Sequence, residues 1–185
     1  MKIAFVIFDE FTSLDFIGAY DPITRLKTMD FLPDLEWDIC SFNDTITDGT
    51  GLIFTPTKVR EPLTKYDLVI IPGGIGTTSL INNSQFINWI KTSGTCKVKA
   101  SVCTGSLILG AAGFLRGKKA TTHPNYFGEL KKYCKVIDKR VVDDGNIITS
   151  RGVSSSLELG LYLCEKLSNY EAKEIIRKQM DYQHQ

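Results

Sequence analysis

The sequence predicts an α/β fold in which a mainly parallel sheet carries helices on both of its faces. Short apolar, β-branched runs alternate along the chain with longer amphipathic runs, and this order builds parallel sheets. The composition, 43% hydrophobic and 23% charged, is typical of a globular protein. The 185 residues contain no repeat, linker or low-complexity segment, so we expect a single domain over residues 1–185.

The strands are expected where apolar and β-branched residues run together between turn-forming residues. Residues 67–71 are the strongest example, because Pro72-Gly73-Gly74 ends the run. Asp144-Gly145 predicts the turn of a hairpin. In chain order the predicted strands are 2–8, 35–42, a weakly supported 52–56, 67–71, 97–102, 120–123 and the two arms of a hairpin within 135–149.

The helices are expected where apolar residues recur at helical spacing. The first starts at Ser13 or Asp15 and contains Pro22, which should kink it or delay its start. The helix over 154–167 begins with three serines that could cap it, and Glu158 lies close to a capping-box position. The first helix continues to residue 26. In chain order the other predicted helices are 82–92, 104–115, 154–167 and 170–182.

Charge and hydropathy limit the partners that we expect. The net charge of +1 gives no bulk attraction to nucleic acid or to a membrane surface. The apolar run at the amino terminus is too short for a signal peptide, and no run reaches the roughly 18 residues of a membrane span. We therefore expect a cytoplasmic protein that acts on a small molecule.

The cysteines and histidines predict neither disulfides nor a metal site. Five cysteines are widely spaced without a CxxC pair, and the chain holds only His123 and His184, to the second of which we assign no role. We expect most of the cysteines to be small core residues, with Cys96 at the boundary of a turn. The core candidates are Cys40, Cys134 and Cys164.

Cys103 is the exception, because it falls between a predicted strand and a predicted helix. Ligands of such sheets bind beyond the carboxyl ends of the strands, where residues 9–18, 72–76 and 101–105 should meet. The N–H groups and dipole of the following helix should favour a thiolate, and a small turn is what a nucleophile elbow requires. The alternative is a core cysteine at a helix start.

Two further features could complete this site. The N–H groups of Gly73-Gly74 could form an oxyanion hole together with that of Thr104, or the glycines could simply end a strand. Asp15, in an apolar context, is either a helix cap or a functional acid whose pKa is raised by burial. His123 could be a general base or a ligand contact, or a structural histidine bonded to the backbone.

Several segments together resemble the DJ-1/PfpI superfamily, and within it the branch of isonitrile hydratases. The resemblance implies a flavodoxin-like three-layer sandwich, a homodimer, and no metal or cofactor. It implies that Cys103 is the nucleophile and Asp15 the acid beside it. Thr104 would place the acid or a water, and its N–H would hold developing negative charge with that of Gly74. The matching segments are 14–18, 67–74, 101–113, 116–123 and 140–149.

The chain also departs from its relatives. Thr104 follows the cysteine where the protease-like branch has histidine, and Asp15 stands where the DJ-1 branch has a glutamate. Pro124-Asn125-Tyr126 and Ser150-Arg151-Gly152 differ from the hydratase pattern, and Arg151 near the site mouth could change the preferred charge of the substrate. The residues expected to line the substrate pocket are Gly73, Ile75, His123, Arg151 and Gly152.

The resemblance and the residues together predict hydration of an isonitrile to an N-formamide through a covalent thioimidate on Cys103. One alternative is glyoxalase-like or deglycase-like chemistry on α-oxoaldehydes, with His123 as an added base. Another is a redox sensor or stress protein whose acidic thiol is oxidised. A DNA-binding regulator is not expected, because no helix-turn-helix segment follows the domain.

Overall fold

The structure, a computed structural model, describes residues 1–183, and His184 lies outside the described residues. Seven strands form the main sheet in the order β10-β11-β7-β6-β1-β2-β5, and every pair is parallel except β10 with β11. Two small sheets pair β3 with β4 and β8 with β9. The strands are β1 (Lys2–Val6), β2 (Glu36–Ser41), β3 (Ile46–Thr47), β4 (Ile53–Phe54), β5 (Lys58–Val59), β6 (Leu68–Ile71), β7 (Val98–Val102), β8 (Lys119–Ala120), β9 (Lys135–Val136), β10 (Val141–Asp143) and β11 (Ile147–Ser150).

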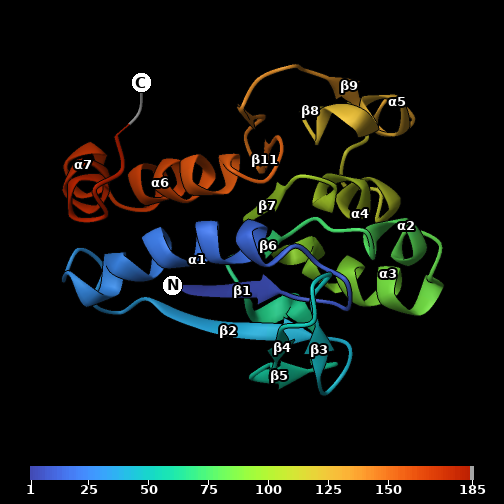
Figure 1. Cartoon of the computed structure of the whole chain (residues 1–185), viewed down its shortest axis with the longest axis horizontal. Helices are drawn as coiled ribbons and strands as arrows, with labels where there is room; N and C mark the ends of the chain where they lie inside the picture. Colours follow the sequence, from blue (N-terminus) through green and yellow to red (C-terminus); the bar gives the residue numbers. More distant parts are fainter. Residues whose placement is uncertain (184–185) are drawn as a thin grey trace.

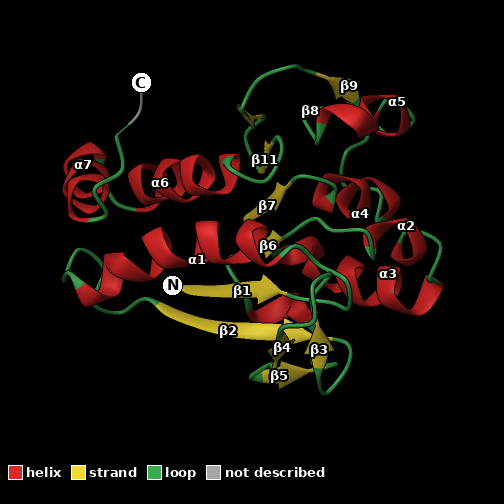
Figure 2. Cartoon of the chain, in the orientation of Figure 1, coloured by secondary structure: helices red, strands yellow, loops and turns green. Residues whose placement is uncertain are grey.

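Helices cover both faces of this sheet, as Figure 1 and Figure 2 show. Helices α1, α6 and α7 pack on one another, whereas α4 packs against α3, β6 and β7. This is the flavodoxin-like sandwich that the sequence predicts. The helices are α1 (Ser13–Thr28), α2 (Thr77–Leu80), α3 (Ser84–Lys91), α4 (Gly105–Ala111), α5 (Phe127–Leu130), α6 (Ser155–Leu167) and α7 (Tyr170–Gln179), with single 3₁₀ turns at Leu63–Lys65, Thr92–Thr95 and Pro124–Tyr126.

The long predicted elements are confirmed, and several boundaries are corrected. Helix α1 starts at Ser13 and continues through Pro22, so the proline does not delay its start. The hairpin turns at Asp144-Gly145, but its arms are β10 and β11, while β9 pairs with β8 instead. Helix α4 ends at Ala111, earlier than predicted, and Gly113 follows with φ +87°. Ser154 makes no side-chain cap bond to α6, and Glu158 binds Arg140 instead of closing a capping box.

The cysteines are free thiols. Cys40 and Cys164 are buried as expected, Cys134 is half-buried, and Cys96 is buried and not at a solvent boundary. Within residues 1–183, no helix combines the length and hydropathy needed to cross a membrane, and no three potential metal ligands gather at one place.

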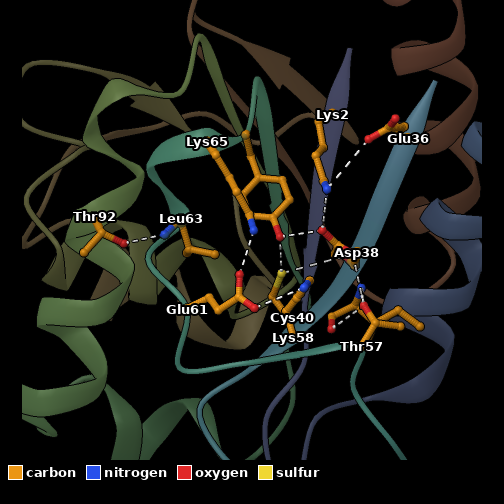
Figure 3. Close-up of polar contacts among 12 residues, drawn as sticks. Lys2, Glu36, Asp38, Cys40, Thr57, Lys58, Glu61, Leu63, Lys65 and Thr92 are labelled. Atoms are coloured by element: carbon orange, nitrogen blue, oxygen red, sulfur yellow. Dashed lines mark hydrogen bonds and ion pairs between the residues drawn. The ribbon is translucent and has the colours of Figure 1, made fainter. Parts of the chain in front are cut away.

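A polar network near the β5 edge of the sheet ties β2 to the amino-terminal end of β1 (Figure 3). Tyr66 donates from its hydroxyl to Asp38 Oδ2 over 2.7 Å and accepts from the Cys40 thiol over 3.4 Å. Lys2 completes the network with an ion pair of 3.0 Å to Asp38. Because each buried polar group has a partner, this edge of the sheet is fixed without a covalent cross-link.

Candidate active site

Cys103 lies at the sharp turn between β7 and α4. Its φ of +54° puts a non-glycine residue in the left-handed region. The Cys103 N–H donates to the carbonyls of Ser150 and Arg151 over 3.1 and 2.7 Å. Its carbonyl accepts from Thr122 Oγ1 and Ser106 Oγ over 2.9 and 3.1 Å. These four bonds hold the strained residue in place, which is the arrangement of a nucleophile elbow.

Asp15 projects from the first turn of α1 and is fully buried. The cap position of α1 is Thr12, so Asp15 is not a helix cap. Its Oδ2 accepts from Gly73 N over 2.8 Å. Oδ1 has no nitrogen or oxygen donor among the described residues, and the Cys103 thiol interacts with this carboxyl. The geometry therefore supports the functional-acid alternative.

Burial sets the protonation of both groups. It raises the pKa of Asp15 to about 7, although the Gly73 N–H and the Cys103 thiol act in the opposite direction. It also raises the pKa of Cys103 to about 12, helped by the charge of Asp15, while the N–H and hydroxyl of Thr104 lower it. The expectation of a resting thiolate is therefore wrong, because desolvation outweighs the short α4 helix. At neutral pH the pair is a thiol beside a partly ionised carboxyl.

Gly73 and Gly74 make this packing possible. A Cβ on Gly73 would lie 2.7 Å from both Cys103 Cβ and Thr104 N, and 2.8 Å from Asp15 Oδ2. Gly74 has φ +137° and packs against the backbone of Phe11. The Gly74 N–H, expected to stabilise an oxyanion, instead donates to Thr104 Oγ1 over 3.0 Å. Both glycines therefore take part in the site and do not only end a strand. The Gly74 N–H, however, holds the Thr104 hydroxyl and is not free for an oxyanion.

Apart from Gly73, which packs against Cys103, the expected pocket residues make their side-chain contacts elsewhere. His123 Nδ1 accepts from Asn125 N over 3.3 Å, and its ring lies beside Gly152, where a Cβ would be 3.0 Å from Cδ2. Arg151 reaches Cys103 only through its carbonyl, because its guanidinium forms an ion pair of 2.7 Å with Asp138. Ile75 is 65% exposed. This geometry matches the expectation that His123 is a structural histidine bonded to the backbone.

Sequence reasoning missed the groups that hold the elbow. Thr122 and Ser106 bond the Cys103 carbonyl, and Ser156 Oγ bonds the carbonyl of Leu14, the residue before Asp15. All three hydroxyls are buried. The only available signal was the abundance of serine and threonine next to the strand ends, which by itself does not say which hydroxyl contacts which carbonyl.

The fold and this site match one protein family. The DJ-1/PfpI family profile matches residues 1–166, and the chain belongs to that family. Isonitrile hydratase of Pseudomonas putida is 34% identical over 98% of this chain and 78% of the relative. Protein DJ-1alpha of Drosophila melanogaster is 34% identical over 90% of this chain and 77% of the relative. The crystal structure of a ThiJ/PfpI family protein from Pseudomonas syringae superimposes with a TM-score of 0.86 at 29% identity, covering 100% of this chain and 76% of that one.

Proposed function

We propose that this protein hydrates an isonitrile to an N-formamide, with Cys103 as nucleophile and Asp15 as proton carrier. The observation that carries the proposal is the fully buried Asp15 carboxyl against the Cys103 thiol, with a pKa of about 7. A carboxyl that titrates near neutral pH can both accept and donate a proton during turnover. The 34% identity to an isonitrile hydratase supports the same reaction class.

In the first half-reaction the thiol adds to the terminal carbon of R–N≡C. The Asp15 carboxylate takes the thiol proton as the carbon–sulfur bond forms, and then delivers that proton to the same carbon. The product is the thioimidate R–N=CH–S–Cys103. The high pKa of the Cys103 thiol requires such a nearby base, because almost no free thiolate exists at neutral pH.

In the second half-reaction water adds to the thioimidate carbon. Asp15, again ionised, accepts a proton from the water and passes it to the imine nitrogen. The tetrahedral intermediate R–NH–CH(OH)–S–Cys103 then collapses: Asp15 takes the hydroxyl proton as the carbon–sulfur bond breaks and returns it to the sulfur, and R–NH–CHO leaves. The hydroxyl of Thr104, fixed by Gly74, lies beside the sulfur and would orient the water.

The test is to incubate the purified protein with cyclohexyl isocyanide and to follow the formamide by mass spectrometry. We expect formamide from the wild type and from a Cys134→Ala control, and none from Cys103→Ala. Near-normal turnover by Cys103→Ala would refute the covalent scheme. Absence of formamide with consumption of methylglyoxal would favour α-oxoaldehyde chemistry, and sulfinylation of Cys103 without any turnover would favour a redox sensor.

We also propose that the protein is a homodimer that buries the apolar side chains between α1 and the β3–β4 hairpin. This face, called the α1–hairpin face below, consists of Leu14, Ile17, Leu52 and Ile53, which are exposed although large and apolar. Phe54 joins its two parts, because its ring lies 5.1 Å from the Phe11 ring and 6.1 Å from the Phe16 ring. Since Leu14 precedes Asp15, a partner seated here would close the site from outside.

A further inference from the structure

Asp48, in the turn of the β3–β4 hairpin, joins that turn to the first residue of α1. Its Oδ2 accepts a hydrogen bond from the Ser13 hydroxyl. Its Oδ1 accepts from the N–H groups of Thr50 and Leu52, both over 2.8 Å. The Thr50 hydroxyl lies 3.0 Å from each of the two carboxylate oxygens. One carboxylate thus closes the hairpin turn and at the same time holds the start of a helix.

Hydrogen bonds alone hold this carboxylate in its charged form. Asp48 is only 6% exposed, and it forms no ion pair with a lysine or arginine among residues 1–183. The Ser13 hydroxyl, together with the N–H groups of Thr50 and Leu52, holds the pKa of Asp48 well below its ordinary value, although burial acts in the opposite direction. Since hydrogen bonds to a charged acceptor are stronger than neutral ones, the bond from Ser13 is a firm link between the hairpin and α1.

Two backbone hydrogen bonds place the β1–α1 loop against the same hairpin. The Glu10 N–H donates to the Thr47 carbonyl over 2.8 Å, and the Gly49 N–H donates to the Phe11 carbonyl over 3.0 Å. Together with the bond from Ser13, they attach the hairpin to the stretch of chain that comes directly before the proposed proton carrier.

The start of α1 has no side-chain cap of its own. Thr12, at the cap position, forms no side-chain bond to the helix. Its N–H donates to the Gly73 carbonyl over 2.9 Å, and its carbonyl accepts from the Asp15 N–H over 3.0 Å. The Asp15 carboxyl accepts from the N–H of the same glycine. A shift of the helix start at Ser13 would therefore move Asp15 relative to Gly73 and to Cys103.

We propose that Asp48 is a positioning residue for the hydration reaction. Through Ser13 it holds the first turn of α1 where the Asp15 carboxyl lies against the Cys103 thiol, and it takes no part in proton transfer itself. The same carboxylate binds the Leu52 N–H, so it also fixes the hairpin half of the α1–hairpin face relative to the half on α1. Its effect on turnover rests on the function proposed above, whereas its hold on Asp15 does not.

Ser13→Ala tests this role, because it removes the bond to α1 and leaves the hairpin turn intact. Thr50→Ala is the matched control, since it removes the other hydroxyl that contacts the same carboxylate. We expect Ser13→Ala to lower kcat for formamide production about tenfold with little change in KM, because the proton carrier is misaligned while substrate binding is retained. Thr50→Ala should leave kcat close to that of the wild type.

Variants of Asp48 itself should follow the same pattern. Asp48→Ala should lower kcat at least as far as Ser13→Ala does. Asp48→Asn keeps an oxygen acceptor for the N–H groups of the hairpin and can donate to the Ser13 hydroxyl, so it should recover most of the loss. A loss of activity in Ser13→Ala that Asp48→Ala does not share would overturn the proposal.

A second measurement does not depend on turnover. The charge of Asp15 raises the pKa of Cys103, so the rate at which iodoacetamide alkylates Cys103 reports whether the carboxyl lies beside the thiol. We expect Ser13→Ala to move this rate toward that of Asp15→Asn. In the Asp15→Asn background Ser13→Ala should have no further effect, since both changes act through one carboxyl.

These measurements separate the positioning role from the reaction. An unchanged alkylation rate in Ser13→Ala, or an equal effect of Ser13→Ala with and without the Asp15 carboxyl, would overturn the proposal. An effect of Thr50→Ala as large as that of Ser13→Ala would do the same, because the link to α1 would then not be what matters. A wild type that makes no formamide, but whose alkylation rate responds to Ser13→Ala as expected, would contradict the proposed function and support the hold of Asp48 on Asp15.

Discussion

Two buried side chains and one glycine decide the chemistry at the scale of single residues. Gly73 leaves free the space of a Cβ, into which the Asp15 carboxyl and Cys103 Cβ both pack, and the thiol interacts with that carboxyl. Cys103 accepts a strained φ of +54° so that its thiol faces that carboxyl. The reactivity of the thiol therefore depends on the charge of Asp15, because that charge raises the pKa of Cys103. Whether its removal speeds or slows reactions of the thiol can be measured.

Replacing Asp15 with asparagine should speed alkylation of Cys103 while slowing hydration. The carboxylate charge raises the pKa of Cys103, so its removal increases the thiolate fraction. We expect iodoacetamide to modify Cys103 roughly tenfold faster at pH 8 in Asp15→Asn, as followed by mass spectrometry of the Cys103 peptide. Formamide production should fall at least about 100-fold, because the proton carrier is lost.

The control for this experiment is Asp21→Asn, which removes an exposed carboxylate paired with Arg25. It should change neither rate. Slower alkylation of Cys103 in Asp15→Asn would show that removal of the thiol proton by the carboxylate outweighs the effect of its charge on the pKa of Cys103.

Asp15 should also make stability fall as the pH rises. Its pKa in the folded protein, about 7, lies above the ordinary value of 3.8. Between these values the folded state keeps a proton that the unfolded chain releases, so the free energy of unfolding decreases by up to roughly 4 kcal/mol from pH 4 to pH 7. Urea denaturation should therefore find Asp15→Asn more stable than the wild type at pH 8 and similar to it at pH 4.5. Equal stability of the two proteins at pH 8 would contradict the raised pKa.

The sequence predicted a raised pKa for Asp15 but not the raised pKa of Cys103. Its position at a strand end selected Cys103, whereas Asp15 stayed open between a helix cap and a functional acid until the family resemblance implied the acid. The protonation state follows from how completely the surrounding side chains exclude water, and a pattern of residue types does not contain that quantity. The same reason explains why Thr122 and Ser106 were missed, since their bonds to the Cys103 carbonyl are purely tertiary.

At the scale of elements, helix α6 holds the start of α1 and with it Asp15. The two helices approach so closely that Gly18 on α1 faces Ser156, and Gly160 on α6 faces Pro22. Ser156 Oγ bonds the carbonyl of Leu14 over 3.1 Å. Periodicity predicted both helices, because their apolar stripes are long. It could not predict β3 or β5, or that β9 pairs with β8, since two-residue strands are defined only by the partner that they meet.

Gly18→Ala should therefore damage both stability and the site. The new Cβ would lie 2.0 Å from Ser156 Oγ and 2.8 Å from Ser156 Cβ, which forces α1 and α6 apart. We expect a loss of about 2 kcal/mol or more in urea denaturation, together with reduced formamide production. Gly128→Ala is the control, because nothing lies within 4 Å of its added Cβ.

A second substitution separates this contact from a general effect of alanine. Ser156→Gly in the Gly18→Ala background removes both clashing atoms and should recover part of the lost stability. If the double variant is no more stable than Gly18→Ala alone, the contact between these two helices is not the cause.

At the scale of the whole molecule, the carboxyl edge of the sheet brings together the residues of the candidate active site. Asp15, Gly73 and Cys103 follow from three neighbouring strands, β1, β6 and β7. The alternation of strands and helices was enough to predict that these strand ends meet. It was not enough to predict the surface beside them, because Leu52 and Ile53 become part of one exposed face only when the β3–β4 hairpin packs on Phe11 and Phe16.

The α1–hairpin face provides the test of assembly. Ile53→Lys puts a charge on a side chain that is 72% exposed and outside the packed core, so the fold should survive while a dimer loses an apolar contact. We expect light scattering after gel filtration to give twice the chain mass for the wild type, and about the chain mass for Ile53→Lys at micromolar concentration. Tyr170→Lys, at a position on α7 that is 63% exposed, should stay dimeric. A wild-type monomer would refute the dimer, and a dimer that Tyr170→Lys disrupts and Ile53→Lys does not would have its interface away from the site.

The same variant tests whether the dimer matters for the reaction. If Ile53→Lys yields a folded monomer that also loses hydration of the isonitrile, closure of the Asp15–Cys103 site depends on the second copy.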